Sequence, residues 1–271
     1  MVKKEWLKMI GAIFGDVVGS IYEFDNHRSK DFELFGKKCS FTDDTVMSVA
    51  LAEALMRIDE DASDLQIKNE IINAFHKYGA IYPYAGYGAR FKRWLVRGER
   101  EPYMSYGNGS AMRVSPVIWF AKSIEETARL ARLSAEVTHN HKEGIKGAVV
   151  TAVAGYMART GSSKEQIRDY IKESYNINFT LDEIRPTYEF NETCQDTVPQ
   201  AMVAFLEGDS LEDTIRNGVS IGGDTDTLCA IAGAVAEAYF GVPDDIKGKT
   251  LSYLNPHLLG VVNDFYKRYV K

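Results

Sequence analysis

Helical periodicity of the apolar residues runs through almost the whole chain, and it limits the possible fold more than any other feature. Successive segments repeat apolar side chains at the spacing of an α-helix, and no run alternates apolar and polar residues as a half-buried strand does. We therefore predict an all-α fold. The expected helices are residues 5–24, 45–58, 64–78, 87–97, 124–138, 144–159, 164–175, 197–207, 210–218, 227–240 and 256–269.

Two of these segments are candidates for the centre of the fold. Residues 144–158 and 228–240 are apolar around almost their whole circumference and rich in Ala and Gly, which is typical of helices packed by neighbours on every side. Nothing in the sequence marks a domain boundary, so we expect residues 1–271 to form one compact bundle of helices packed at steep angles. Capping-box spacing marks three helix starts independently: Ser123 with Glu126, Ser163 with Gln166, and Thr180 with Glu183.

Charge and cysteine content exclude several classes of protein. A net charge of −6 argues against an extended nucleic-acid surface, which would be basic. Cys39, Cys194 and Cys229 lack the number and spacing of a disulfide framework or a zinc site, so we expect a cytoplasmic protein. Asp16 interrupts the apolar stretch at residues 3–22, so we expect no membrane span there.

Two short acidic loops carry the strongest functional signal. Residues 41–45 read Phe-Thr-Asp-Asp-Thr, residues 222–227 read Gly-Gly-Asp-Thr-Asp-Thr, and each precedes a predicted helix. Thr and Asp often cap helices, but one cap needs only one side chain. Four carboxylates would repel one another without a cation, and oxygen ligands alone suit Mg²⁺ or Mn²⁺. The pairing predicts a site for two divalent cations.

The first predicted helix carries acids and glycines on one face. Asp16, Gly19 and Glu23 follow one another at i, i+3 and i+7, so the two carboxylates would flank a position without a side chain. A glycine within a helix indicates close approach by a neighbour. We assign Gly11 and Gly15 to helix packing, and Gly19 and Glu23 to the functional site.

Residues 106–113, Tyr-Gly-Asn-Gly-Ser-Ala-Met-Arg, form a second candidate segment. Glycines before a helix start let backbone N–H groups converge on an anion, although an ordinary turn explains this segment equally well. We expect His139 to contact a ligand and His141 to face solvent. The residues at 87, 91 and 94 form an aromatic core stripe rather than a purine platform, and the arginines at 90, 93 and 97 form a solvated stripe.

Together, these segments resemble the ADP-ribosylglycohydrolase family. The resemblance extends from about residue 10 to about residue 240, with the motifs in the family's order. The matching segments are Gly15-Asp16-x-x-Gly19-x-x-x-Glu23, Phe41-Thr42-Asp43-Asp44-Thr45, Gly107-Asn108-Gly109-Ser110-Ala111-Met112-Arg113, Thr138-His139 and Gly222-Gly223-Asp224-Thr225-Asp226-Thr227.

The resemblance implies a compact all-α fold with a binuclear Mg²⁺ or Mn²⁺ centre. It implies Thr42, Asp43, Asp44, Asp224, Asp226 and Thr227 as metal ligands. It further implies that ADP-ribose is bound by Ser105, Tyr106, Gly107, Asn108, Gly109, Ser110 and His139. The general base would be Asp43, Asp44 or Glu23, the last on a mobile segment over the cleft.

The expected function is metal-dependent hydrolysis of the glycosidic bond between ADP-ribose and a protein side chain or a small molecule. Two alternatives stay open at this point. One is a non-catalytic ADP-ribose-binding or crystallin-like relative, which would lack metal-dependent turnover. The other is a Mg²⁺-dependent diphosphate enzyme of the terpenoid-synthase type, although Asp44 is not followed by the DDxxD spacing of that class.

Overall fold

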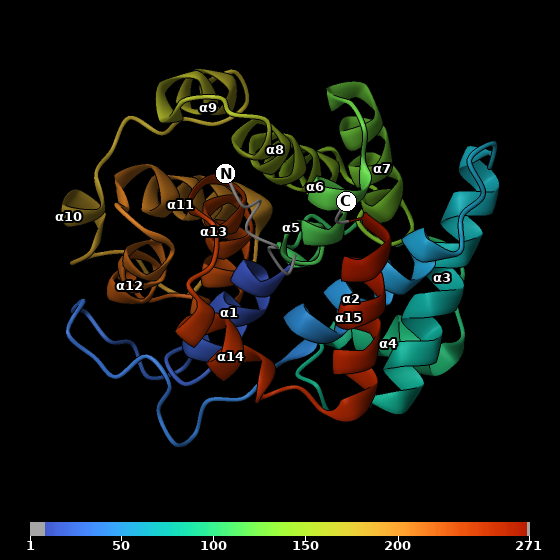
Figure 1. Ribbon diagram of the computed structural model, residues 1–271, viewed down its shortest axis with the longest axis horizontal. Helices are drawn as coiled ribbons and strands as arrows, with labels where there is room; N and C mark the ends of the chain where they lie inside the picture. The colour runs from blue at the N-terminus through green and yellow to red at the C-terminus, as the bar shows by residue number, and fades with distance from the viewer. Residues whose placement is uncertain (1–8, 270–271) are drawn as a thin grey trace.

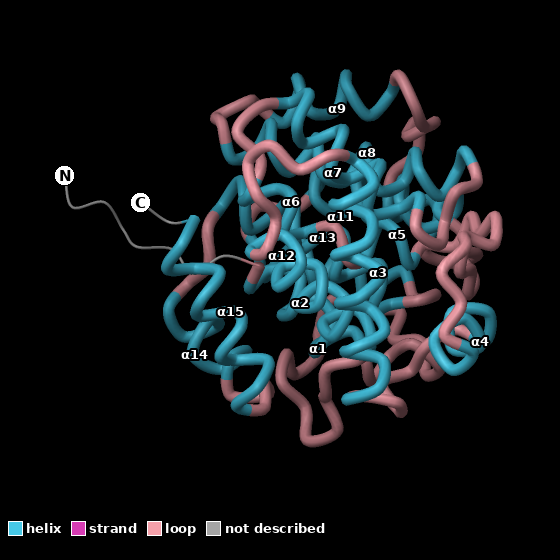
Figure 2. The backbone as a smooth tube through the Cα atoms, turned by 90° about the vertical axis from the view of Figure 1, so that its right-hand side faces the viewer, coloured by secondary structure: helices cyan, strands magenta, loops and turns pink. Residues whose placement is uncertain are grey.

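The structure, a computed structural model, describes residues 9–269. Within that range all regular elements are helices, and one isolated β-bridge joins Gly107 to Thr193. Figures 1 and 2 show the helices packed around a common centre. The all-α prediction is therefore confirmed. The helices are α1 (Ile10–Gly19), α2 (Asp43–Met56), α3 (Asp64–Ile81), α4 (Ala89–Arg97), α5 (Gly109–Met112), α6 (Ser115–Phe120), α7 (Ile124–Glu136), α8 (Lys142–Arg159), α9 (Lys164–Lys172), α10 (Leu181–Ile184), α11 (Cys194–Glu207), α12 (Leu211–Ile221), α13 (Thr225–Phe240), α14 (Asp244–Leu251) and α15 (Pro256–Tyr269).

Helix α13 occupies the centre of the fold. All of its side chains from Thr225 to Glu237 are buried, and α1, α8, α11 and α12 pack around it. Helix α8 is buried against α7, α13 and α5, but it leaves Ile145 and Val149 partly exposed. The predicted central position is thus confirmed for α13, while α8 is central on most of its surface. Figure 1 shows α1 and α11–α13 on one side, and α2–α4 and α15 on the other.

Glycines let α1 and α13 approach with their backbones in contact. A Cβ atom at Gly11 would overlap the carbonyl oxygen of Gly233, and one at Gly15 would lie 2.7 Å from the backbone nitrogen of Ala230. Any side chain at these positions would push the helices apart. Gly11 and Gly15 are therefore packing residues, as the sequence predicted.

The first helix is shorter than predicted. The expectation covered residues 5–24, but α1 ends at Gly19, and residues 5–8 lie outside the described part of the chain. Glu23 therefore lies in the following loop. The prediction that Asp16 and Glu23 share one face of a helix is wrong. Four of the described helices, α5, α6, α10 and α14, have no counterpart among the predicted ranges, because they are short. The capping box at Thr180 nevertheless marked the start of α10.

Helix caps and the aromatic stripe agree largely with the sequence. The capping boxes at Ser163 and Thr180 are complete. At Ser123 the hydroxyl accepts the N–H of Glu126 at 3.2 Å, while the Glu126 carboxylate accepts the N–H of Lys122 at 2.6 Å. The residues at 87, 91 and 94 are buried core aromatics, as predicted.

Among the described helices, none is long and apolar enough to cross a membrane.

Candidate functional site

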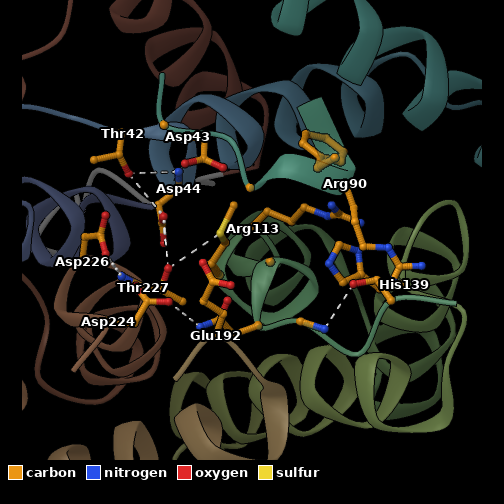
Figure 3. Close-up of a pocket in the computed structure, with 18 of the residues that line it drawn as sticks. Thr42, Asp43, Asp44, Arg90, Arg113, His139, Glu192, Asp224, Asp226 and Thr227 are labelled. Carbon is orange, nitrogen blue, oxygen red and sulfur yellow. Dashed lines mark hydrogen bonds between the residues drawn. The ribbon is translucent and has the colours of Figure 1, made fainter. Parts of the chain in front are cut away.

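The acidic loops begin α2 and α13, and the fold brings these two helix starts together. The Thr42 hydroxyl caps α2 by accepting the N–H of Asp44 at 3.3 Å. Across the site, the Thr227 hydroxyl donates to Asp44 Oδ2 at 3.3 Å, although 183 positions separate these residues. Figure 3 shows both loops at one side of a pocket. The prediction that the loops meet is confirmed.

Gly19 positions the second loop. A Cβ atom at Gly19 would lie 2.6 Å from the Cα atom of Asp226, and the Thr225 hydroxyl donates to the Gly19 carbonyl at 2.8 Å. Gly19 therefore packs closely against α13 as Gly11 and Gly15 do, and the backbone that it contacts is that of the second acidic loop. Its assignment to the site stays a prediction.

Asp16 is a site residue that the predicted ligand set omitted. Its fully buried carboxylate accepts hydrogen bonds from the N–H of Thr42 at 2.9 Å and from the N–H of Thr45 at 3.0 Å. The hydroxyls of both threonines also donate to it. Burial raises the pKa of Asp16 to about 6, although these donors oppose the shift. An acid within an otherwise apolar helix was the available sequence signal.

Carboxylate oxygens form two groups, each within 4.8 Å. One contains Asp16, Asp44 and Asp226, and the other contains Glu23, Asp224 and Asp226. Asp226 belongs to both. Asp43 lies outside both groups, although it lines the same pocket. Among the described residues, no Lys or Arg forms an ion pair with any of these acids.

The electrostatics of these groups fit a cation site. Burial raises the pKa of Asp44 well above its usual range, and the charges of Asp226 and Asp16 raise it further. Asp44 Oδ1 is buried, and no described residue offers it a hydrogen bond. A buried carboxylate oxygen without a donor is costly, and a hard divalent cation would satisfy it. The donor set, oxygen only and anionic, therefore fits Mg²⁺ or Mn²⁺.

Glu23 lines the pocket from the loop after α1. Burial raises the pKa of its half-buried carboxyl to about 8, and the nearby charges of Asp226 and Glu192 add to the shift. Such a group can hold or release a proton near neutral pH. Glu192 lines the pocket as well and was not predicted as a site residue.

The glycine-rich loop forms another wall of the pocket. Ser105, Gly107, Asn108 and Gly109 line it, whereas Tyr106 and Ser110 are absent from its lining. The buried Ser110 hydroxyl donates to the Gly144 carbonyl at 2.7 Å, away from the pocket. Neither Gly107 nor Gly109 has a positive φ, so close approach rather than turn geometry explains these glycines.

Asn108 connects this loop to the second acidic loop. Its side-chain amide donates to Asp224 Oδ2 at 2.7 Å and to the Thr197 hydroxyl at 3.1 Å. Its backbone N–H donates to the Glu192 carbonyl at 2.8 Å. The Asn108 side chain therefore positions Asp224. The sequence predicted Asn108 only as a residue that contacts ADP-ribose.

His139 is buried in the pocket wall next to the loop. Burial lowers its pKa well below the usual range, and the charges of Arg113 and Arg90 lower it further. The ring is therefore neutral at physiological pH. Its Nδ1 atom lies 2.8 Å from the Thr138 hydroxyl. His141, expected to face solvent, caps α8 by accepting the N–H of Glu143 at 3.2 Å.

The pocket encloses about 300 Å³ between the acidic groups and this histidine. Every predicted metal-ligand and general-base residue lines it, as do five of the seven predicted ADP-ribose contacts. Sequence reasoning missed Arg90, which was assigned to a solvated stripe but lines the pocket beside Tyr103. Figure 3 shows Arg90 and His139 at the end of the pocket opposite Asp226.

Comparisons with known proteins agree with the geometry. The chain is 28% identical to the human (Homo sapiens) ADP-ribosylhydrolase ARH3, over 86% of this chain and 84% of that protein. It is 24% identical to the ADP-ribosylarginine hydrolase Tri1 of Pseudomonas putida, over 86% and 70% of the two chains. A solved structure titled "ADP-ribosylglycohydrolase-related protein complex" superimposes with a TM-score of 0.70 at 23% identity, covering 98% of this chain and 99% of that chain. The ADP-ribosylglycohydrolase family model matches residues 8–270, and the chain therefore belongs to this family.

Proposed function

We propose that this protein hydrolyses the glycosidic bond between ADP-ribose and an acceptor, with two divalent cations as cofactors. The observation that carries the proposal is the pair of carboxylate groups that share Asp226 in the pocket. A carboxylate that belongs to both groups would be within reach of two neighbouring cations, and paired cations lie about 3.5–4 Å apart in two-metal sites. Human ARH3 and Tri1 are named as ADP-ribosylhydrolases, which supports the choice of substrate.

The residues that would hold the cations are the four aspartates of the two acidic loops and the hydroxyls of Thr42 and Thr227, with Glu23 beside them in the same pocket. Cations bound there would lower the pKa of water and stabilise negative charge on ribose oxygens. Asp16 already accepts four hydrogen-bond donors from Thr42 and Thr45, so we assign it to positioning the first loop rather than to primary ligation.

In glycoside hydrolysis the oxygen of water bonds to the anomeric carbon as the bond to the acceptor breaks; a carboxylate takes the proton from water, and the acceptor atom leaves with a proton. Asp43 lies outside both carboxylate groups, and the pKa of Glu23 is close to neutral pH. We assign proton transfer to one of these two residues. The neutral His139 faces the opposite part of the pocket, where it can hydrogen-bond to the substrate without adding charge.

The test is release of ADP-ribose from an ADP-ribosylated arginine peptide, an ADP-ribosylated serine peptide and O-acetyl-ADP-ribose, each with Mg²⁺, Mn²⁺ or EDTA. We expect metal-dependent release from at least one substrate and none from Asp226→Asn. Binding of ADP-ribose without release from any substrate would instead identify a binding protein. The cytoplasmic location expected from the sequence stays a prediction.

A further inference from the structure

The two ends of the pocket differ in charge. The carboxylates of the two acidic loops gather at one end, while Arg90, Arg113 and the neutral His139 lie toward the other. The charges of both arginines lower the pKa of His139, so both guanidinium groups act on the same region. An elongated ligand with an anionic segment beyond its metal-binding part would match this distribution.

The two arginines are not equivalent. Arg113 is fully buried, donates to the Ser134 carbonyl and the Thr138 hydroxyl at 2.8 Å each, and lies 4.5 Å above the Phe75 ring. It is held in the protein core and joins the loop to the end of α7. Arg113 can contribute positive potential to the pocket, but its packing leaves little freedom to rearrange around a ligand.

Arg90 contacts the backbone and the ring of one residue, Tyr103. It lies in the first turn of α4, its side chain is exposed, and one guanidinium nitrogen donates to the Tyr103 carbonyl. Its guanidinium group lies 5.0 Å from the centre of the Tyr103 ring. Among the described residues, no carboxylate forms an ion pair with Arg90. Since a guanidinium has five N–H donors, most of those on Arg90 remain available to a ligand.

The glycine-rich loop offers fewer free donors than its sequence indicated. The N–H of Asn108 is used by the Glu192 carbonyl, and the N–H of Gly107 donates to the Ser105 hydroxyl at 3.2 Å. Two of the loop's backbone donors are therefore already occupied within the protein. A cationic side chain at the pocket wall would add charge-assisted donors to those that the loop leaves free.

We propose that Arg90 binds the diphosphate of the ligand and thereby selects substrates that carry a diphosphate next to the ribose. This inference rests on the proposed function. The Tyr103 carbonyl and ring hold the guanidinium at the pocket wall, so part of its conformational freedom is already lost before the ligand binds. The planar guanidinium can then donate two hydrogen bonds to phosphate oxygens, as guanidinium groups do at phosphate sites.

The experiment compares Arg90→Gln with Arg93→Gln. Both substitutions remove one positive charge from an exposed position on α4, but Arg93 is absent from the pocket lining. Binding of ADP-ribose and of adenosine is measured by calorimetry, with Mn²⁺ and again in EDTA. We expect Arg90→Gln to weaken ADP-ribose binding at least tenfold in both conditions, to leave adenosine binding within twofold, and to reduce the salt dependence of ADP-ribose binding.

Each other outcome is decisive. If Arg90→Gln binds ADP-ribose as Arg93→Gln does, while the unmodified protein binds and hydrolyses its substrate, the inference is wrong and the proposed function stands. If adenosine binding falls as much as ADP-ribose binding, Arg90 contacts the base and the diphosphate assignment is overturned. If the unmodified protein neither binds ADP-ribose nor releases it from any substrate, both proposals fail.

Discussion

Replacing Asp224 by Asn should stabilise the metal-free protein at pH 8. Burial raises the pKa of Asp224 from 3.8 to about 6, a difference of roughly two units. At about 1.4 kcal/mol per unit, ionising this buried group costs roughly 3 kcal/mol of folding free energy. Asn removes that cost, and its side-chain oxygen can still accept the hydrogen bond that Asn108 donates to Asp224.

The sign of the pH dependence follows from the raised pKa. Between the unfolded value near 3.8 and the folded value near 6, the folded state holds a proton that the unfolded state has lost. Stability contributed by Asp224 is therefore greatest at low pH and is lost as the pH rises through this window. Asp16 has the same folded value and adds a change in the same direction. Without metal, the protein should become less stable from about pH 4 to pH 7.

Thermal unfolding in EDTA at pH 5 and pH 8, repeated with Mn²⁺, measures both effects. Asp224→Asn should unfold several degrees higher than the unmodified protein at pH 8 in EDTA, and the difference should shrink at pH 5. Mn²⁺ should stabilise the unmodified protein strongly and the variant weakly. Asp169→Asn, at an exposed position on α9, is the matched control and should behave as unmodified. A lower melting temperature for Asp224→Asn at pH 8 in EDTA, or equal stabilisation of both proteins by Mn²⁺, would refute the electrostatic argument.

Two further substitutions test the wall that faces the acids. Gly109→Val should weaken ADP-ribose binding at least tenfold while leaving Mn²⁺ binding unchanged. A Cβ atom there would already lie 3.2 Å from His139 Nε2, and the larger side chain would fill the pocket. Calorimetry with each ligand checks this, and an unaltered affinity for ADP-ribose would contradict it. Arg113→Met should lower the free energy of unfolding by about 2 kcal/mol or more, because the Ser134 carbonyl and the Thr138 hydroxyl would lose a buried charged donor. A urea titration measures the change. Unfolding of the variant at the midpoint of the unmodified protein would show that these hydrogen bonds contribute little.

The sequence predicted the helices and the acidic loops because both signals are local. An apolar circumference rich in Ala and Gly identified α13 as a central helix, and two carboxylates in each loop exceeded what a helix cap requires. The meeting of the loops could be expected only because a cation would have to balance their charge. The loops meet because α1 packs closely on α13, and the regularly spaced glycines of α1 were the sign of that packing in the sequence.

The roles of Arg90 and Asn108 could not be read from the sequence. Arg90 follows a helical period shared with other exposed arginines, and only the course of the chain around Tyr103 brings it to the pocket. Asn108 belongs to a glycine-rich segment typical of anion binding, yet its side chain contacts an aspartate from the distant second acidic loop. Such contacts depend on where loops lie after the helices have packed, which periodicity does not encode.

The glycines of α1 allow a test of whether helix packing controls the site. Gly19→Ala would place a Cβ atom 2.6 Å from the Cα atom of Asp226, whereas Gly11→Ala would place one 2.5 Å from the Cβ atom of Glu237, toward the other end of α13. Both variants should lose stability because both force the same two helices apart. Only Gly19→Ala should also displace Asp226, which both carboxylate groups share, so we expect its Mn²⁺ affinity to fall at least tenfold while Gly11→Ala binds Mn²⁺ normally. Calorimetry at a temperature where both variants are folded separates the two effects. Equal Mn²⁺ affinities for the two variants would show that the cation site does not depend on how closely α1 approaches the start of α13.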